Sequence, residues 1–169
     1  GLNLTWEVCQ GIVCHSKPQG DFLDAAAVES LTLEAQVLRL ADSVAYLNHD
    51  IADAMRAGVL LAADLPEDAD RVLGNSHSRR IDTLVTDVVR ASWAASGTEG
   101  EPVEPPPTIT MGPEVRGAMN TLRDFMFQRV YLPLGRSEES EAAGEMVRML
   151  YHHLVNHSED IPPVYFHHE

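Results

Sequence analysis

Three residues with functional side chains recur at every fourth position in the middle of the chain: Asp42, Tyr46 and Asp50. In a helix, a four-residue spacing places all three on one side, and His49 and Asp53 fall on the same strip. Two carboxylates separated by an aromatic hydroxyl can bind a metal ion and a sugar. The solvated outer face of an amphipathic helix has the same spacing, so the spacing alone leaves both interpretations open.

Arginines and late histidines provide further candidates. Arg79 and Arg80 begin a predicted helix, where their guanidinium groups can bind the phosphates of a substrate or effector, or pair with acidic residues at the surface. His153 and His157 are one helical turn apart, a spacing that can chelate a metal ion. No third ligand lies near them in the sequence, so exposure or adventitious metal binding is the simpler interpretation.

Helical periodicity accounts for the elements that position these residues. The strip lies in a predicted helix that ends at about residue 57, with Ser30 or Thr32 as its N-cap and Gly58 as its C-terminal stop. Further helices are predicted over 3–15, from 65 onward, and over 76–96, 114–131 and 138–157. Since no stretch alternates in the manner of a strand, the sequence predicts an all-α fold with a proline-rich acidic loop at 97–113.

Two apolar faces are expected to form the core. The predicted helix with the strip has an opposite, apolar arc: Val37, Leu40, Val44, Leu47, Ile51 and Met55. The predicted helix at 76–96 has a second apolar face: Ile81, Leu84, Val85, Val88, Val89 and Trp93. These faces can also pack on helices that lie outside the given sequence.

The composition is acidic and limits the partners. The 169 residues include 12 lysines and arginines against 26 aspartates and glutamates, which gives a formal net charge of -14. Such a surface repels double-stranded nucleic acid and anionic membranes, although a phosphorylated substrate can bind where a metal ion and arginines offset the charge. No apolar run could span a bilayer and no signal-peptide pattern is seen, so a cytoplasmic location is expected. Cys9 and Cys14 are expected to be free, buried or half-buried thiols.

Several separated blocks resemble one family. Residues 42–58 resemble the late metal-ligand helix of the bacterial deoxyguanosinetriphosphate triphosphohydrolases, which are HD-domain phosphohydrolases that act on deoxynucleoside triphosphates. The opening segment, 1–15, is similar to the stretch that precedes this helix in the family, and three later blocks look like its later landmarks: 80–89, 122–131 and 157–162. The resemblance implies an incomplete helical HD-domain-like fold, with 1–60 in the catalytic core and 61–169 in a C-terminal helical region.

The resemblance also implies a role for each residue of the strip. Asp42 matches one ligand of a catalytic divalent metal, either Mg²⁺ or Mn²⁺ or, with histidine co-ligands, Fe, Co or Ni. Tyr46 matches the tyrosine that packs against the deoxyribose and leaves little room for a 2′-hydroxyl. Asp50 matches the carboxylate that accepts a hydrogen bond from the sugar 3′-OH. The family's H…HD signature and its acid–base groups do not precede Asp42, so we expect no catalytic residue within this sequence.

Two main function classes stay open at this point. The first is metal-dependent hydrolysis of a deoxynucleoside triphosphate to the deoxynucleoside and inorganic triphosphate by a longer parent protein, with this chain inactive or weakly active alone. The second is a non-catalytic helical module for oligomerisation or nucleotide-effector binding. A third and weaker candidate is an HD-type phosphohydrolase that acts on another nucleotide. The resemblance implies a homo-oligomer and a nucleotide effector.

Overall fold

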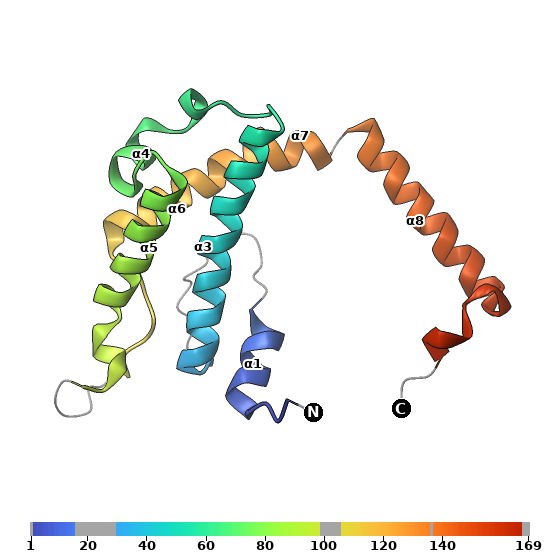
Figure 1. The fold of residues 1–169 in the computed structure, drawn as a ribbon, viewed down its shortest axis with the longest axis horizontal. Helices are drawn as coiled ribbons and strands as arrows, with labels where there is room; N and C mark the ends of the chain where they lie inside the picture. Colours follow the sequence, from blue (N-terminus) through green and yellow to red (C-terminus); the bar gives the residue numbers. More distant parts are fainter. Residues whose placement is uncertain (1, 16–29, 99–105, 136, 167–169) are drawn as a thin grey trace. The chain divides into compact units, whose positions relative to one another are not determined.

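The computed structural model describes residues 2–15, 30–98, 106–135 and 137–166, and this part of the chain is helical without any strand (Figure 1). The all-α prediction is confirmed. The α-helices are α1 (Trp6–Cys14), α3 (Leu33–Arg56), α4 (Glu67–Leu73), α5 (His77–Ala91), α6 (Pro113–Met126), α7 (Leu132–Gly135) and α8 (Glu138–Asn156). Short 3₁₀ turns cover Ala62–Asp64, Trp93–Ser96, Ser158–Asp160 and Pro163–Phe166, and a π-helical turn covers Phe127–Tyr131.

The chain divides into two compact units, Gly1–Met126 and Phe127–Glu169. The expected division at residue 60 between a catalytic core and a C-terminal region stays a prediction. Residues 99–105 of the expected loop at 97–113 lie outside the described residues, and α6 begins at the last residue of that range. Within the described residues, no helix has both the length and the apolar character needed to cross a membrane.

The longest helix, α3, begins and ends where the sequence predicts. The Thr32 hydroxyl accepts a hydrogen bond from the backbone N–H of Ala35 at 3.2 Å, which satisfies one unpaired donor of the first turn. After Arg56 the chain reverses at Gly58, whose φ of +70° suits a residue without a Cβ, and its N–H donates to the Met55 carbonyl. These two features define where α3 starts and stops.

The first unit is built around the buried face of α3. α1 packs against α3, α5 runs beside it in the opposite direction, and α6 contacts both α3 and α4 (Figure 1). Buried apolar side chains come from α3, α4, α5 and α6: Leu40, Leu47, Ile51, Leu73, Leu84, Met119, Leu122 and Met126. The faces predicted to be apolar are only partly enclosed, because Val37 of α3 and Val85, Val89 and Trp93 after it stay about half exposed.

The π-helical turn of the second unit has a cause in the sequence. Pro133 has no N–H to donate to the carbonyl of Arg129, and its ring crowds that carbonyl, so a regular α-helical ladder cannot continue through this turn. The backbone widens to a π-helix just before it, at Phe127–Tyr131. The sequence predicted one helix through Tyr131, and the structure instead ends the α-helical part, α6, at Met126.

In the second unit, α8 begins at the predicted residue. The Ser137 hydroxyl caps it by accepting a hydrogen bond from the backbone N–H of Ser140 at 3.1 Å. One side of α8 carries a row of exposed apolar side chains: Met146, Val147, Leu150, Tyr151 and Val155. Cys9 and Cys14, in α1 of the first unit, are free thiols; Cys14 is half-buried as expected, whereas Cys9 is exposed because no described residue covers its side of α1.

Candidate functional site

The predicted functional strip lies on one continuous helix. α3 runs unbroken from Leu33 to Arg56, so Asp42, Tyr46 and Asp50 follow one another up one side, each about 6 Å further along the axis. Asp42 and Asp50 are half-buried, whereas the Tyr46 ring is 62% exposed. The structure therefore places an exposed tyrosine between two partly enclosed carboxylates, and the three residues share the side of α3 that their spacing predicted.

The two other residues of the strip have local partners. Asp53 forms an ion pair with Arg56 one turn further along α3, both of them exposed. The ring of His49 lies 5.7 Å from that of His77 at the start of α5, measured between centroids. Asp53 and His49 are thus accounted for by a surface ion pair and by a contact between helices.

A buried polar cluster supports the strip from behind, and sequence reasoning did not find it. Arg80 is only 3% exposed, and its Nε donates to Oδ1 of the fully buried Asn48 at 3.2 Å. Asn48 in turn donates from Nδ2 to the Val44 carbonyl at 2.8 Å. Arg80 Nη1 also lies 3.8 Å from Oδ1 of Asp70 on α4. One guanidinium therefore joins α3, α4 and α5.

Burial of the charged Arg80 guanidinium costs free energy, because the group loses its contact with water. Burial lowers the pKa of the Arg80 guanidinium, and the carboxylate of Asp70 opposes this shift. The signal for this cluster is present in the sequence at Asn48, which lies four residues after Val44 and three before Ile51 on the buried face of α3. A polar side chain at a core position needs a polar partner, but which arginine supplies it depends on tertiary packing.

The neighbouring Arg79 differs from Arg80. Its side chain is exposed, and its backbone N–H donates to the Ser76 hydroxyl, the N-cap of α5, at 3.3 Å. The Arg79 side chain is thus exposed to solvent at the start of α5, while the guanidinium of Arg80 faces the core. The phosphate or effector contact expected of these two arginines stays a prediction.

A second buried polar residue, Gln36, ties α3 to the segment before α6. Its Nε2 donates to the Leu31 carbonyl, and its Oε1 accepts from the backbone N–H of Ile109, both at 2.9 Å. Nearby, the Asp87 carboxylate accepts a hydrogen bond from Gly112 N–H at 2.7 Å. Gln36 is therefore a buried side chain that is hydrogen-bonded to backbone groups of two segments.

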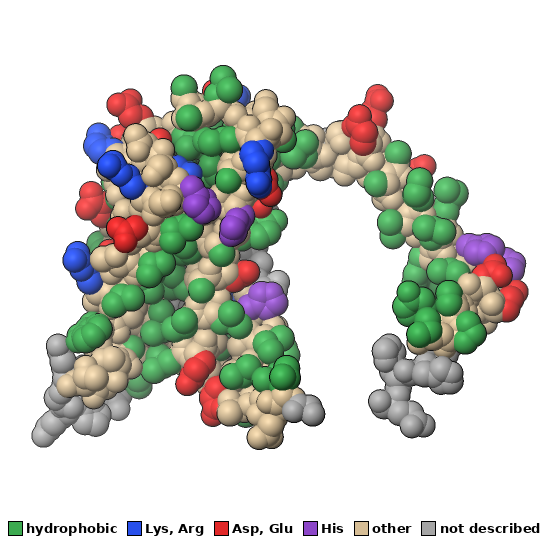
Figure 2. Space-filling model, viewed as in Figure 1, with side chains coloured by type: hydrophobic (Ala, Val, Ile, Leu, Met, Phe, Trp, Pro, Cys, Tyr) green, Lys and Arg blue, Asp and Glu red, His purple; other side chains and the backbone are tan. Residues whose placement is uncertain are grey.

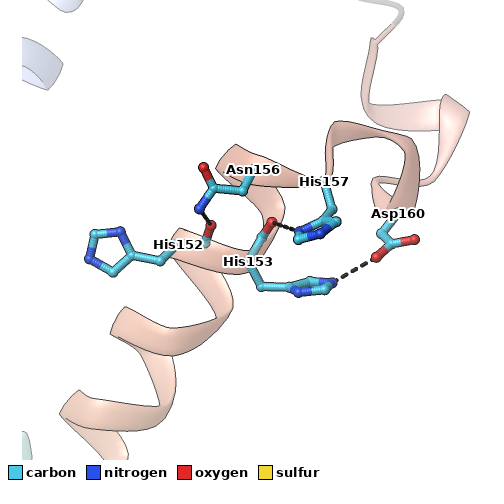
Figure 3. Close-up of polar contacts among 5 residues, drawn as sticks. All are labelled: His152, His153, Asn156, His157 and Asp160. Carbon is cyan, nitrogen blue, oxygen red and sulfur yellow. Dashed lines mark hydrogen bonds and ion pairs between the residues drawn. The ribbon is translucent and has the colours of Figure 1, made fainter.

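The late histidines form a cap at the end of α8 (Figure 3). His153 Nε2 lies 2.7 Å from Oδ2 of Asp160, and the His153 and His157 rings stack with centroids 4.6 Å apart. Asn156 donates to the His152 carbonyl at 2.9 Å. Among the residues described, no group of three or more histidine, cysteine or acidic side chains is arranged to hold a metal ion.

Comparison with known proteins identifies the family. The sequence model of the phosphohydrolase-associated domain matches residues 109–168. The chain is 37% identical, over 96% of its length, to a deoxyguanosinetriphosphate triphosphohydrolase-like protein of Caldanaerobacter subterraneus. It is 39% and 38% identical, over 98% of its length, to proteins of the same name from Clostridium tetani and Clostridium perfringens. The chain belongs to this phosphohydrolase family.

The alignment with the triphosphohydrolase-like proteins covers nearly all of this chain but only part of each relative. The chain spans less than half of the relatives it matches, namely 42% of the Caldanaerobacter protein and 45% of each clostridial one. The phosphohydrolase-associated domain begins just before α6 and continues past α8, so α3 and its strip precede it. Only the comparison with whole relatives therefore reaches Asp42, Tyr46 and Asp50.

Proposed function

We propose that this chain forms one wall of the active site of a metal-dependent hydrolase that acts on deoxynucleoside triphosphates. The observation that carries the proposal is the exposed Tyr46 between two partly enclosed carboxylates on α3, in a chain whose relatives are named deoxyguanosinetriphosphate triphosphohydrolase-like. The net reaction consumes one water and releases the deoxynucleoside and inorganic triphosphate. Which deoxynucleotide is preferred is left to the assay below.

Asp42 is assigned as one ligand of the divalent ion. A carboxylate on a rigid helix suits Mg²⁺ or Mn²⁺, and histidine co-ligands would extend the choice to Fe, Co or Ni. The described residues supply no complete set of ligands, and the chain covers less than half of the Caldanaerobacter and Clostridium tetani relatives, so we assign the remaining ligands to the part of such a protein that this sequence does not include. When bound, such an ion acts as a Lewis acid toward a phosphoryl oxygen.

Tyr46 and Asp50 are assigned to the sugar. The exposed Tyr46 ring offers a flat apolar surface against which a deoxyribose can pack, and it fills the space that a 2′-hydroxyl would need. One turn further on, the Asp50 carboxylate can accept a hydrogen bond from the 3′-OH. The order along α3 thus follows the order of the substrate, from phosphate to sugar.

The experiment needs a complete protein. We define the extended protein as the Clostridium tetani relative in which residues 1–169 replace the matching segment. With dGTP and a divalent metal it is expected to release inorganic triphosphate, whereas residues 1–169 alone are expected to show weak activity or none. Robust, Asp42-dependent turnover by the isolated chain would overturn the assignment of the remaining metal ligands to a part of the protein outside this sequence.

Tyr46→Ala tests the sugar assignment. In the extended protein, the rate ratio for dGTP over GTP is expected to fall by about tenfold or more, since the variant removes the steric barrier to the 2′-hydroxyl. Tyr151→Ala, which removes an exposed tyrosine from α8, is the matched control and should leave the ratio unchanged. An unchanged ratio in Tyr46→Ala would favour an HD-type hydrolase with a different substrate.

A second candidate function rests on the exposed apolar side of α8, which is typical of an association surface. On this alternative the chain is a non-catalytic module that forms a homo-oligomer or binds a nucleotide effector, with the exposed Arg79, rather than the buried Arg80, as the phosphate contact. Light scattering of the extended protein and of its Val147→Asp variant measures the association. Association that depends on Val147 together with an absence of hydrolysis would favour this alternative.

A further inference from the structure

An apolar groove of about 570 Å³ runs between α3 and α5. Val37, Leu40 and Val44 line it from α3, and Val85, Val89 and Trp93 line it from α5 and the turn that follows. Figure 2 shows hydrophobic side chains gathered between the two helices, along the groove. The groove shares only His49 with the functional strip, because Asp42, Tyr46 and Asp50 are not among the residues that line it.

The exposed apolar residues of the groove walls lie next to one another instead of being scattered over the surface. Val85 is 49% exposed and Trp93 50%, and both belong to one contiguous apolar surface. Scattered apolar side chains are common on protein surfaces, whereas a contiguous apolar groove marks a site of interaction. A small polar ligand fits poorly, because sites for such ligands carry polar groups placed to bind them, and the described residues that line this groove are apolar except for His49, Ser92 and Ser96.

The shape of the groove suits a helix. α3 and α5 are antiparallel neighbours, and the channel between two such helices accepts the side-chain ridge of a third. Along α3 the lining residues extend from Leu33 to His49, which corresponds to about 24 Å or somewhat more than four helical turns. An occupant of that length needs one apolar side along its whole course.

We infer that the α3–α5 groove is the docking surface for an amphipathic helix from the part of the polypeptide that the relatives have outside the matched segment. More than half the length of each clostridial relative lies outside that segment, whereas the match covers 98% of this chain. The described residues of the first unit form their own core and leave this groove open, and we assign the covering element to the remainder. The inference rests on membership of the family and does not depend on which substrate is hydrolysed.

Trp93 provides a direct reporter. The chain has two tryptophans, so the Trp6→Phe variant leaves Trp93 in the groove as the single emitter. Quenching by acrylamide is measured for this variant as the isolated chain and within the extended protein, where every tryptophan of the remaining Clostridium tetani part is replaced by phenylalanine. The quenching constant is expected to fall by about threefold in the extended protein, because a covered indole is shielded from the quencher. Equal quenching in the two proteins would overturn the inference.

A charged substitution in the groove separates docking from folding. Val85→Asp should restore the quenching of Trp93 in the extended protein, yet leave the helical circular dichroism of the isolated chain unchanged, since Val85 is half exposed there. Val13→Asp, at an exposed valine on α1 that does not line the groove, is the control and should change neither measurement. If Val85→Asp unfolds the isolated chain as well, the groove belongs to its own core and the inference fails.

The remaining outcomes are also decisive. Acrylamide quenching of Trp93 in the isolated chain could fall as the protein concentration rises, while light scattering shows a dimer. This result would assign the groove to a second copy of the chain and overturn the inference. An extended protein that lacks hydrolysis but protects Trp93 would retain the docking surface and reject the proposed function. The two proposals therefore fail separately.

Discussion

Replacing Arg80 with Met tests whether this arginine holds the helices together or binds phosphate. Met keeps an unbranched stem of similar length and removes the guanidinium. The variant leaves Oδ1 of Asn48, which is fully buried, without its donor, and takes the cation away from Asp70. Removing one partner of a buried polar pair costs more than the net worth of the interaction, because the other partner stays desolvated.

The magnitude follows from these contacts. An unsatisfied buried amide oxygen costs about 1–3 kcal/mol. The Arg80–Asp70 pair adds about 1 kcal/mol or less, because its atoms are 3.8 Å apart and the Asp70 side chain is 21% exposed. Relief from burying the guanidinium offsets part of this loss, so we expect a decrease of about 2–3 kcal/mol in the free energy of unfolding. For a chain of this size the melting temperature then falls by about 5–10 °C.

Thermal unfolding followed by circular dichroism measures this change. The control is Arg79→Met, at the exposed neighbouring arginine, and its free energy of unfolding is expected to stay within about 0.5 kcal/mol of the parent.

Although burial lowers the pKa of Arg80, a guanidinium remains charged near neutrality. The destabilisation should therefore be constant between about pH 6 and 8. In the double variant Asn48→Leu/Arg80→Met, the loss should be smaller than the sum of the single losses. Unchanged melting of Arg80→Met, combined with lost nucleotide binding by the extended protein, would refute the structural role.

Two further predictions concern the ends of helices. Thr32→Ala removes the hydroxyl that accepts from Ala35 N–H, and urea unfolding should show a loss of about 1 kcal/mol; an unchanged midpoint would mean that the cap contributes nothing. Gly74→Ala should cost more than Gly58→Ala in the same assay. Both glycines have positive φ, but only the Cβ added at Gly74 meets another side chain, 2.7 Å from Cβ of Arg79. Equal losses would contradict this packing argument.

The sequence predicted α3 and its strip well because both depend on local information. A spacing of four residues places Asp42, Tyr46 and Asp50 on one side of any helix, and a Thr32 cap with Gly58 beyond the end defines where that helix starts and stops. The structure confirms the helix and the shared side. The chemical roles of the three residues remain predictions, since a helix alone does not show what it binds.

Other features depended on packing between distant segments and could not be read from spacing. Arg80 lies near the start of a helix in an acidic protein, where an arginine is usually exposed, and its burial follows from Asn48, 32 residues earlier. The apolar face at 81–93 predicted a core, yet its Val85 and Val89 line an open groove. Periodicity indicates which side of a helix is apolar but does not identify the element that covers it.

The most direct measurement compares Asp42→Asn with Asp53→Asn in the extended protein, assayed for metal-dependent release of inorganic triphosphate from dGTP. The two variants remove the same charge from the same helix, and Asp53 is already accounted for by its ion pair with Arg56. We predict that Asp42→Asn lowers turnover by about 100-fold or more and weakens the metal dependence. Asp53→Asn should stay within about threefold of the parent. Equal activity in both variants would contradict the assignment of Asp42 to the metal.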